Sequence, residues 1–120
     1  MKHILLLALL VIGAEPKQFD ASIHVFTASW CEPCKQLKPT LTKLEKDFPN
    51  IKIVFIDTDV RTDLTTNNKI TQIPTCLFFR GEAKVPEKGK SYMTVPVTTV
   101  TGYASESTLK AAVAKTLTTE

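Results

Sequence analysis

Two cysteines lie three positions apart in the stretch WCEPCK, residues 30–35. Thiols at this spacing can act as a reversible redox couple, supply half of a metal site, or close a structural cross-link. The chain has three cysteines, of which the third is Cys76. Any disulfide within the chain therefore leaves one thiol over.

A structural cross-link and a metal site both fit the sequence poorly. A bridge across so short a loop adds little stability, because the stabilisation grows with the length of the loop that is closed. Zinc takes four ligands, and no second CxxC pair completes a site. Beyond residue 14 the thiol and imidazole ligands are only Cys31, Cys34, Cys76 and His24. We therefore expect no metal and no cofactor other than a redox-active Cys31–Cys34 pair.

The hydrophobic pattern predicts elements that place this pair at a junction between a strand and a helix. Residues 22–28 form a compact apolar and β-branched run, which predicts a buried strand. After the pair, Leu37, Leu41, Leu44 and Phe48 fall on one helical stripe. Further strands are predicted at 51–56, 75–79 and 98–103, a short helix at 61–68 capped by Asp59, and a last helix from Ser105 to Leu117.

The order of these elements predicts an α/β fold. The first strand–helix–strand unit gives a parallel pair through a right-handed crossover, and the last two strands give an antiparallel hairpin. The expected architecture is a three-layer α/β/α sandwich with a mixed central sheet. Residues 82–97 are too long for a simple hairpin loop, so we expect an insertion that either extends the hairpin or forms an exposed flap.

These motifs together resemble the thioredoxin family. The chain has a strand running into WCxPCK, a proline at position 39 in the following helix, and the triplet Ile73-Pro74-Thr75. A CxxC pair alone is a weak signal, whereas the combination in a βαβ context is specific. The resemblance covers roughly Ser22 to Leu117. It implies a thioredoxin-like domain at 15–120 and a thiol–disulfide oxidoreductase that reduces or exchanges protein disulfides.

The expected mechanism depends more on the placement of the two thiols than on their acidity. Cys31 is expected at a helix N-terminus, where free amide groups favour its thiolate. It attacks a disulfide of a partner, and Cys34 resolves the mixed disulfide from within one helical turn. Pro33 suits an early helix position and stiffens the pair. The charge of Glu32, where thioredoxins commonly have glycine, opposes the thiolate.

The neighbours of the pair have expected roles in contacting substrate. Trp30 is expected at the lip beside the reactive sulfur, with a core position as the alternative. Lys35 is either a positive charge near the thiolate or a solvated helix residue. The resemblance implies a cis bond between Ile73 and Pro74 that faces the cysteines. It also implies that the Ile73 backbone pairs with substrate and that Pro74 keeps metal away from the thiols. Thr75 comes directly after this proline, as a threonine does in thioredoxins.

The chain departs from the thioredoxin pattern inside the site. Thioredoxins usually bury an aspartate six residues before the first cysteine, with a lysine from the next strand beside it. This chain has Val25 and Phe55 at those positions. The proton of the resolving thiol must then leave through water, Glu32 or the partner, and we expect a slower second step.

Cys76 is expected to be a buried thiol, with a third redox thiol as the alternative.

Two other functions stay open on the sequence. The CEPC stretch also resembles exported dithiol reductases of cytochrome maturation, which belong to the same superfamily. A thioredoxin fold can also serve as a non-catalytic binding subunit.

The N-terminus and the charge bear on location and partners. Residues 1–14 have a basic start and an apolar run, which predicts a signal peptide, with a buried first element as the alternative. The run is too short to span a bilayer. Cleavage would make the protein periplasmic or secreted, and otherwise it is expected in the cytoplasm. The net charge of +3 is spread over the chain, which predicts no nucleic-acid partner. We expect a monomer whose partners are protein disulfide or dithiol substrates and an upstream reductase or oxidant.

Overall fold

A mixed β-sheet forms the centre of the protein. The computed structural model describes residues 18–118, and within that range the sheet has four strands in the order β2-β1-β3-β4. β1 pairs parallel with β2, and β3 pairs antiparallel with β4, which confirms the two predicted pairings. β1 also pairs antiparallel with β3, a pairing that was not predicted. The strands are β1 (Ala21–Thr27), β2 (Ile51–Asp57), β3 (Thr75–Arg80) and β4 (Thr98–Thr101).

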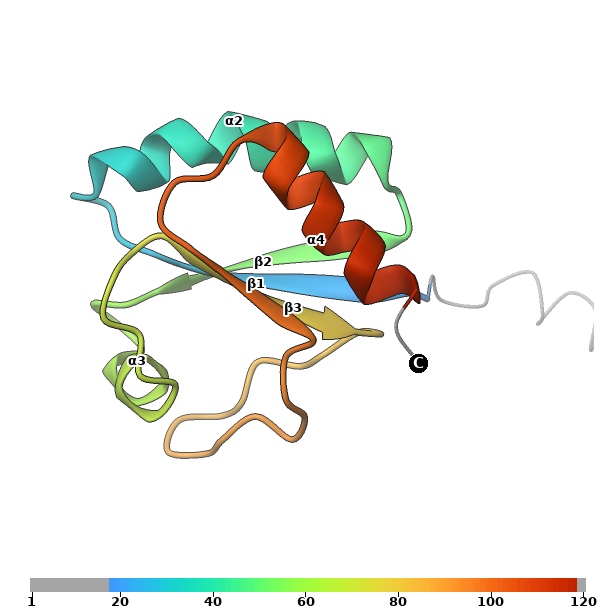
Figure 1. Cartoon of the computed structure of the whole chain (residues 1–120). Coiled ribbons are helices and arrows are strands. Elements are labelled where there is room, and N and C mark those ends of the chain that lie inside the picture. The colour runs from blue at the N-terminus through green and yellow to red at the C-terminus, as the bar shows by residue number, and fades with distance from the viewer. Residues whose placement is uncertain (1–17, 119–120) are drawn as a thin grey trace, which may run out of the picture.

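Helices on both faces of the sheet complete the predicted α/β/α sandwich (Figure 1). α2 (Glu32–Asp47) and α4 (Glu106–Thr118) lie together on one face, and α3 (Thr62–Asn67) lies on the other. Ser105, with which the last helix was predicted to begin, caps α4, because its hydroxyl accepts a hydrogen bond from the amide of Thr108. The fold matches the architecture expected from the order of the elements.

Each face of the sheet has its own core, because side chains alternate along β1 and β3. Ile23, Val25 and Phe78 are buried on the face that α2 and α4 cover, where they belong to one cluster with the leucines of α2. Phe26 and Phe79 are buried in a second cluster with Leu64 of α3 on the other face. Burial on both faces explains why β1 is apolar along nearly its whole length.

The insertion at 82–97 is anchored to the sheet and contains no strand, so it does not extend the hairpin. His24 of β1 holds it at two points: Nδ1 lies 2.7 Å from the Tyr92 hydroxyl, and Nε2 lies 3.1 Å from the Ala83 carbonyl oxygen. The ring of Tyr92 also stacks on Phe79, with 4.8 Å between centroids. The expected exposed flap is found over most of residues 87–95, where Met93 is almost fully exposed and Tyr92 is the anchored exception.

The anchoring imidazole makes the stability of the fold depend on pH. Burial lowers the pKa of His24, so the folded protein keeps the ring neutral, whereas the unfolded chain takes up a proton below about pH 6.5. We expect the free energy of unfolding to be constant above about pH 7.5 and to fall progressively toward about pH 5.5, where the unfolded chain gains a proton that the folded protein does not take up. Urea unfolding across this interval measures the change. His24→Gln should flatten the curve, and a flat wild-type curve would contradict the role of His24.

Candidate active site

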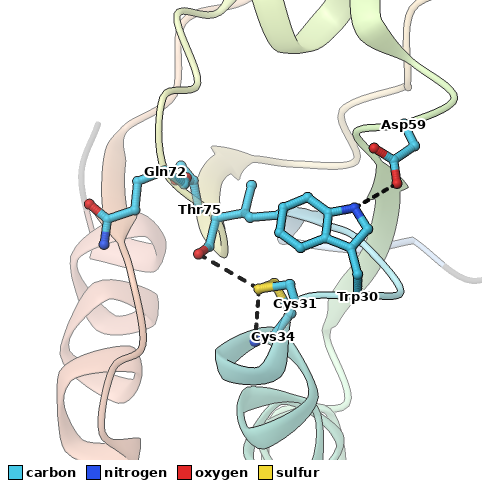
Figure 2. The surroundings of a disulfide bond; sticks show 7 residues. Trp30, Cys31, Cys34, Asp59, Gln72 and Thr75 are labelled. Atoms are coloured by element: carbon cyan, nitrogen blue, oxygen red, sulfur yellow. Dashed lines mark hydrogen bonds between the residues drawn. A yellow bond between two sulfur atoms is a disulfide. The ribbon is translucent and has the colours of Figure 1, made fainter.

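The two cysteines of the CxxC pair lie where β1 leads into α2. Cys31 is the N-cap residue of α2, and Cys34 lies in the first turn. A disulfide bond joins them, with their Cα atoms 5.3 Å apart. The amide of Cys34 donates a hydrogen bond to Sγ of Cys31 over 3.3 Å, as Figure 2 shows. The helix N-terminus therefore points a donor at the sulfur that bears the negative charge when the bond is reduced.

The disulfide is largely covered by the protein. The exposed fractions are 4% for Cys31 and 7% for Cys34, and both residues pack with Ala28 and Ile73. A partner that reaches this bond must therefore dock against the residues around it.

The triplet Ile73-Pro74-Thr75 forms one side of the site. The Ile73–Pro74 peptide bond is cis, as the resemblance implies, and the Ile73 carbonyl oxygen lies 3.8 Å from Sγ of Cys31. The Pro74 carbonyl accepts a hydrogen bond from the amide of Gly102, which ties the triplet to the end of β4. Thr75 is buried at the start of β3. The main chain of Ile73 is thus held beside the reactive sulfur, and its pairing with substrate stays a prediction.

Trp30 forms an exposed rim next to the disulfide, which supports the lip position over the core position. Its exposed fraction is 68%, and its indole Nε1 donates a hydrogen bond to the Asp59 carboxylate over 2.9 Å (Figure 2). The prediction that Asp59 caps α3 is wrong, because the N-cap residue is Arg61 and has no side-chain capping bond. Asp59 is a site residue that the sequence analysis missed. Its one sequence signal is its place just after β2, beside the parallel strand that leads to Trp30.

The remaining residues of the motif lie on the first turn of α2. Pro33 is among the first helical residues, as expected. Glu32 and Lys35 are exposed, so water and salt weaken the effect of their charges on the sulfur atoms. Lys35 nevertheless lines a groove that also reaches Cys34. Both residues lie beside the disulfide, and their roles stay predictions.

The interior of the site is apolar where thioredoxins usually have an acid. Val25 is buried in the core cluster beneath α2, and its register partner Phe55 is half exposed at the edge of the sheet. The ammonium of Lys38 lies 5.4 Å from the centre of the Phe55 ring. Charged groups therefore approach Cys34 from the groove between α2 and β2. Asp57 of β2 lines the same groove, and the sequence analysis did not identify it.

The third cysteine lies away from the disulfide, in the core of the protein. Cys76 is fully buried, pairs with Val25 across the sheet, and belongs to the cluster beneath α2 and α4. Burial raises the pKa of its thiol to about 12. The expectation of a buried thiol is confirmed. Cys76 and His24 are not brought to the CxxC pair, and among residues 18–118 no group of three or more His, Cys, Asp or Glu residues could hold a metal ion. The helices of this range are also too short or too polar to cross a membrane.

Comparison with models of known protein families identifies the family of this chain. The family model described as Thioredoxin matches residues 15–114. That match covers most of the sequence, including both cysteines and the cis-proline triplet. The protein therefore belongs to the thioredoxin family.

Individual relatives agree with this assignment. The chain is 39% identical over 59 residues to the mitochondrial thioredoxin-3 of Saccharomyces cerevisiae, which is 49% of this chain and 46% of that protein. It is 37% identical over 81 residues to the mitochondrial thioredoxin O1 of Arabidopsis thaliana, which is 63% of this chain and 42% of that protein. These matches thus span less than half of either relative's length.

A solved structure extends the likeness to the fold. The crystal structure of oxidised mitochondrial thioredoxin 3 from Saccharomyces cerevisiae superposes with a TM-score of 0.64 at 26% identity. The superposition covers 82% of this chain and 80% of that one.

The burial of Cys76 predicts that only two of the three thiols react in the folded protein. After reduction of the disulfide, a thiol reagent such as DTNB at pH 8 should titrate two thiols per chain. The third should react only after denaturation, because a buried neutral thiol is a poor nucleophile. A Cys76→Ala variant should give two thiols both folded and denatured. Rapid reaction of three thiols in the folded wild type would contradict the burial.

Proposed function

We propose that this protein is a thiol–disulfide oxidoreductase that reduces or exchanges disulfides of other proteins through Cys31 and Cys34. The observation that carries the proposal is the disulfide at the N-terminus of α2, with the amide of Cys34 directed at Sγ of Cys31. This arrangement supports the charge of an attacking thiolate and holds the resolving thiol within one helical turn. The protein works as a monomer and uses no metal.

The reaction starts from the reduced pair. The Cys31 thiolate attacks one sulfur of a partner's disulfide, the partner's sulfur–sulfur bond breaks, and the other sulfur leaves as a thiolate that takes up a proton. Cys34 then attacks the Cys31 sulfur and releases the second thiol of the partner. Two electrons pass to the partner, and the Cys31–Cys34 disulfide remains. An upstream dithiol reductase restores the reduced pair. With an upstream oxidant instead, the same steps run backwards, and the Cys31–Cys34 disulfide oxidises a dithiol of the partner.

Protein substrates fit the surface around the disulfide. Exposed side chains of Trp30, Val60 and Tyr103 stand at the ends of three segments that meet there. Val60 follows Asp59, which accepts the hydrogen bond from the Trp30 indole. Tyr103 follows Gly102, whose amide donates a hydrogen bond to the Pro74 carbonyl. Such exposed apolar groups suit an extended segment of a partner better than a small, highly charged thiol. The carbonyl of Ile73 lies where it can pair with the main chain of that segment.

Substitution of each cysteine separates the two chemical steps. In an insulin-reduction assay with dithiothreitol, Cys31→Ser should lower the rate at least about a hundredfold, because the attacking thiolate is lost. Cys34→Ser should also stop turnover but accumulate a mixed disulfide, which intact-mass spectrometry detects. Cys76→Ala is the matched control and should retain the wild-type rate.

The same variants test the two alternative functions. Full biological activity of the Cys31→Ser, Cys34→Ser double variant would contradict the oxidoreductase and indicate a non-catalytic binding subunit. Activity restricted to haem-binding CxxCH segments of apocytochromes would indicate a specialised reductase of cytochrome maturation. The thioredoxins found among the relatives favour the general disulfide reductase over both.

We also propose that residues 1–14 direct export and are then removed. They lie outside the described residues, and the proposal rests on their basic start, apolar run and the small residue Ala14. Protein recovered from cells that can export it should begin at Glu15, as read by N-terminal sequencing. A Leu7→Arg substitution in the apolar run should keep the chain inside the cell. Recovery of the intact N-terminus in the cytoplasmic or mitochondrial fraction would contradict export.

A further inference from the structure

The resolving thiol must lose a proton in surroundings that do not favour its charge. Cys34 is almost fully covered, and it packs with the apolar side chains of Ala28 and Ile73. On the core side of α2, the strand beneath it presents Val25, which is buried in an apolar cluster. A thiolate is disfavoured in such surroundings unless a polar route reaches it. The proton of Cys34 therefore needs an exit that does not cross the core.

One groove leads from Cys34 to charged groups. Its volume is about 380 Å³, and it lies between the end of β1, the first turns of α2 and the end of β2. Its charged lining residues are Lys35 and Lys38 from α2 and Asp57 from β2. A water molecule occupies about 30 Å³ of liquid, so a groove of this size holds a chain of them.

The charged groups of the groove are held in place. Asp57 is the register partner of Thr27 at the end of the parallel pair, and its Oδ1 accepts a hydrogen bond from the amide of Asp59 over 2.9 Å. Lys38 of α2 lies over the ring of Phe55, which is on β2 as Asp57 is. An anionic acceptor and two ammonium groups thus face the groove from opposite elements.

We propose that Asp57 accepts the proton of Cys34 through water in this groove during the resolving step, and that Lys35 and Lys38 stabilise the thiolate that forms. This inference rests on the proposed function. The Cys34 thiol passes its proton along the water to the Asp57 carboxylate, and the resulting thiolate attacks the Cys31 sulfur of the mixed disulfide. The bond between Cys31 and the partner breaks, the Cys31–Cys34 bond forms, and the partner's thiolate leaves with a proton from solvent. Asp57 then returns its proton to the groove water.

Asp57→Asn tests the proposal because the rate of the resolving step should fall if Asp57 accepts the proton, and should not fall if Asp57 is only a nearby negative charge. Reduced protein is mixed with DTNB in a stopped-flow instrument, and the second, concentration-independent release of thionitrobenzoate reports the resolving step. As a proton acceptor, Asp57 speeds this step most where the thiol is protonated. The rate of Asp57→Asn should fall about tenfold at pH 6.5 and stay within about twofold of wild type at pH 9. As a bystander, the carboxylate only opposes the thiolate, so the variant should be equally fast or faster at pH 6.5.

Two further variants complete the test. Asp47→Asn removes the same charge at the far end of α2, where Asp47 pairs with Lys110, and should leave the second phase unchanged at both pH values. Lys38→Gln should slow the second phase at pH 6.5, because it removes a charge that favours the thiolate. An unchanged or raised rate in Asp57→Asn at pH 6.5, with normal cycling of the wild type, would overturn this inference alone. A wild type that shows no second phase would overturn the proposed function itself.

Discussion

The position of β1 between a parallel and an antiparallel neighbour is the constraint on which the site depends. Because β2 runs parallel to β1, both strands end at the same edge of the sheet, and the residues that follow them meet there. Because β3 runs antiparallel, it begins where β1 ends, with Thr75 opposite Phe26. The CxxC pair, Thr75 of the cis-proline triplet and Asp59, which follows β2, thus lie together at this end of the strands (Figure 2).

The two faces of the sheet have different roles: one positions the disulfide, and the other anchors the insertion. On one face, α2 is fixed by leucines that are completely buried, so its N-terminus is held against the disulfide. On the other face, His24 of β1 binds Tyr92 of the 82–97 insertion in a polar contact within an aromatic cluster. A buried imidazole is tolerated there because both of its nitrogens have hydrogen-bond partners. The insertion therefore packs on the α3 face of the sheet, against a different cluster from the one that contains the disulfide.

Two positions at which this chain departs from the common thioredoxin pattern lie near the resolving thiol: Val25 beneath α2, and Phe55 in the groove that reaches Cys34. With Val25 and Phe55 in place of an acid and a lysine, neither the buried position nor the half-exposed one carries a charge. The groove between α2 and β2 places charges of both signs on the solvent side instead. Because groups on that side are closer to water, their individual effects are weaker than those of buried charges.

The sequence by itself determined the elements and the reactive pair, because these depend on local spacing. Alternation and helical stripes placed the strands and α2 to within a few residues, and WCEPCK with Ile73-Pro74-Thr75 indicated the dithiol site. Only the tertiary structure decided which distant side chains meet. The bond from Trp30 to Asp59, the contact of His24 with Tyr92 and the groove shared by Cys34 and Asp57 all join separate elements. Strand register and helix packing set these distances, and no local pattern encodes them.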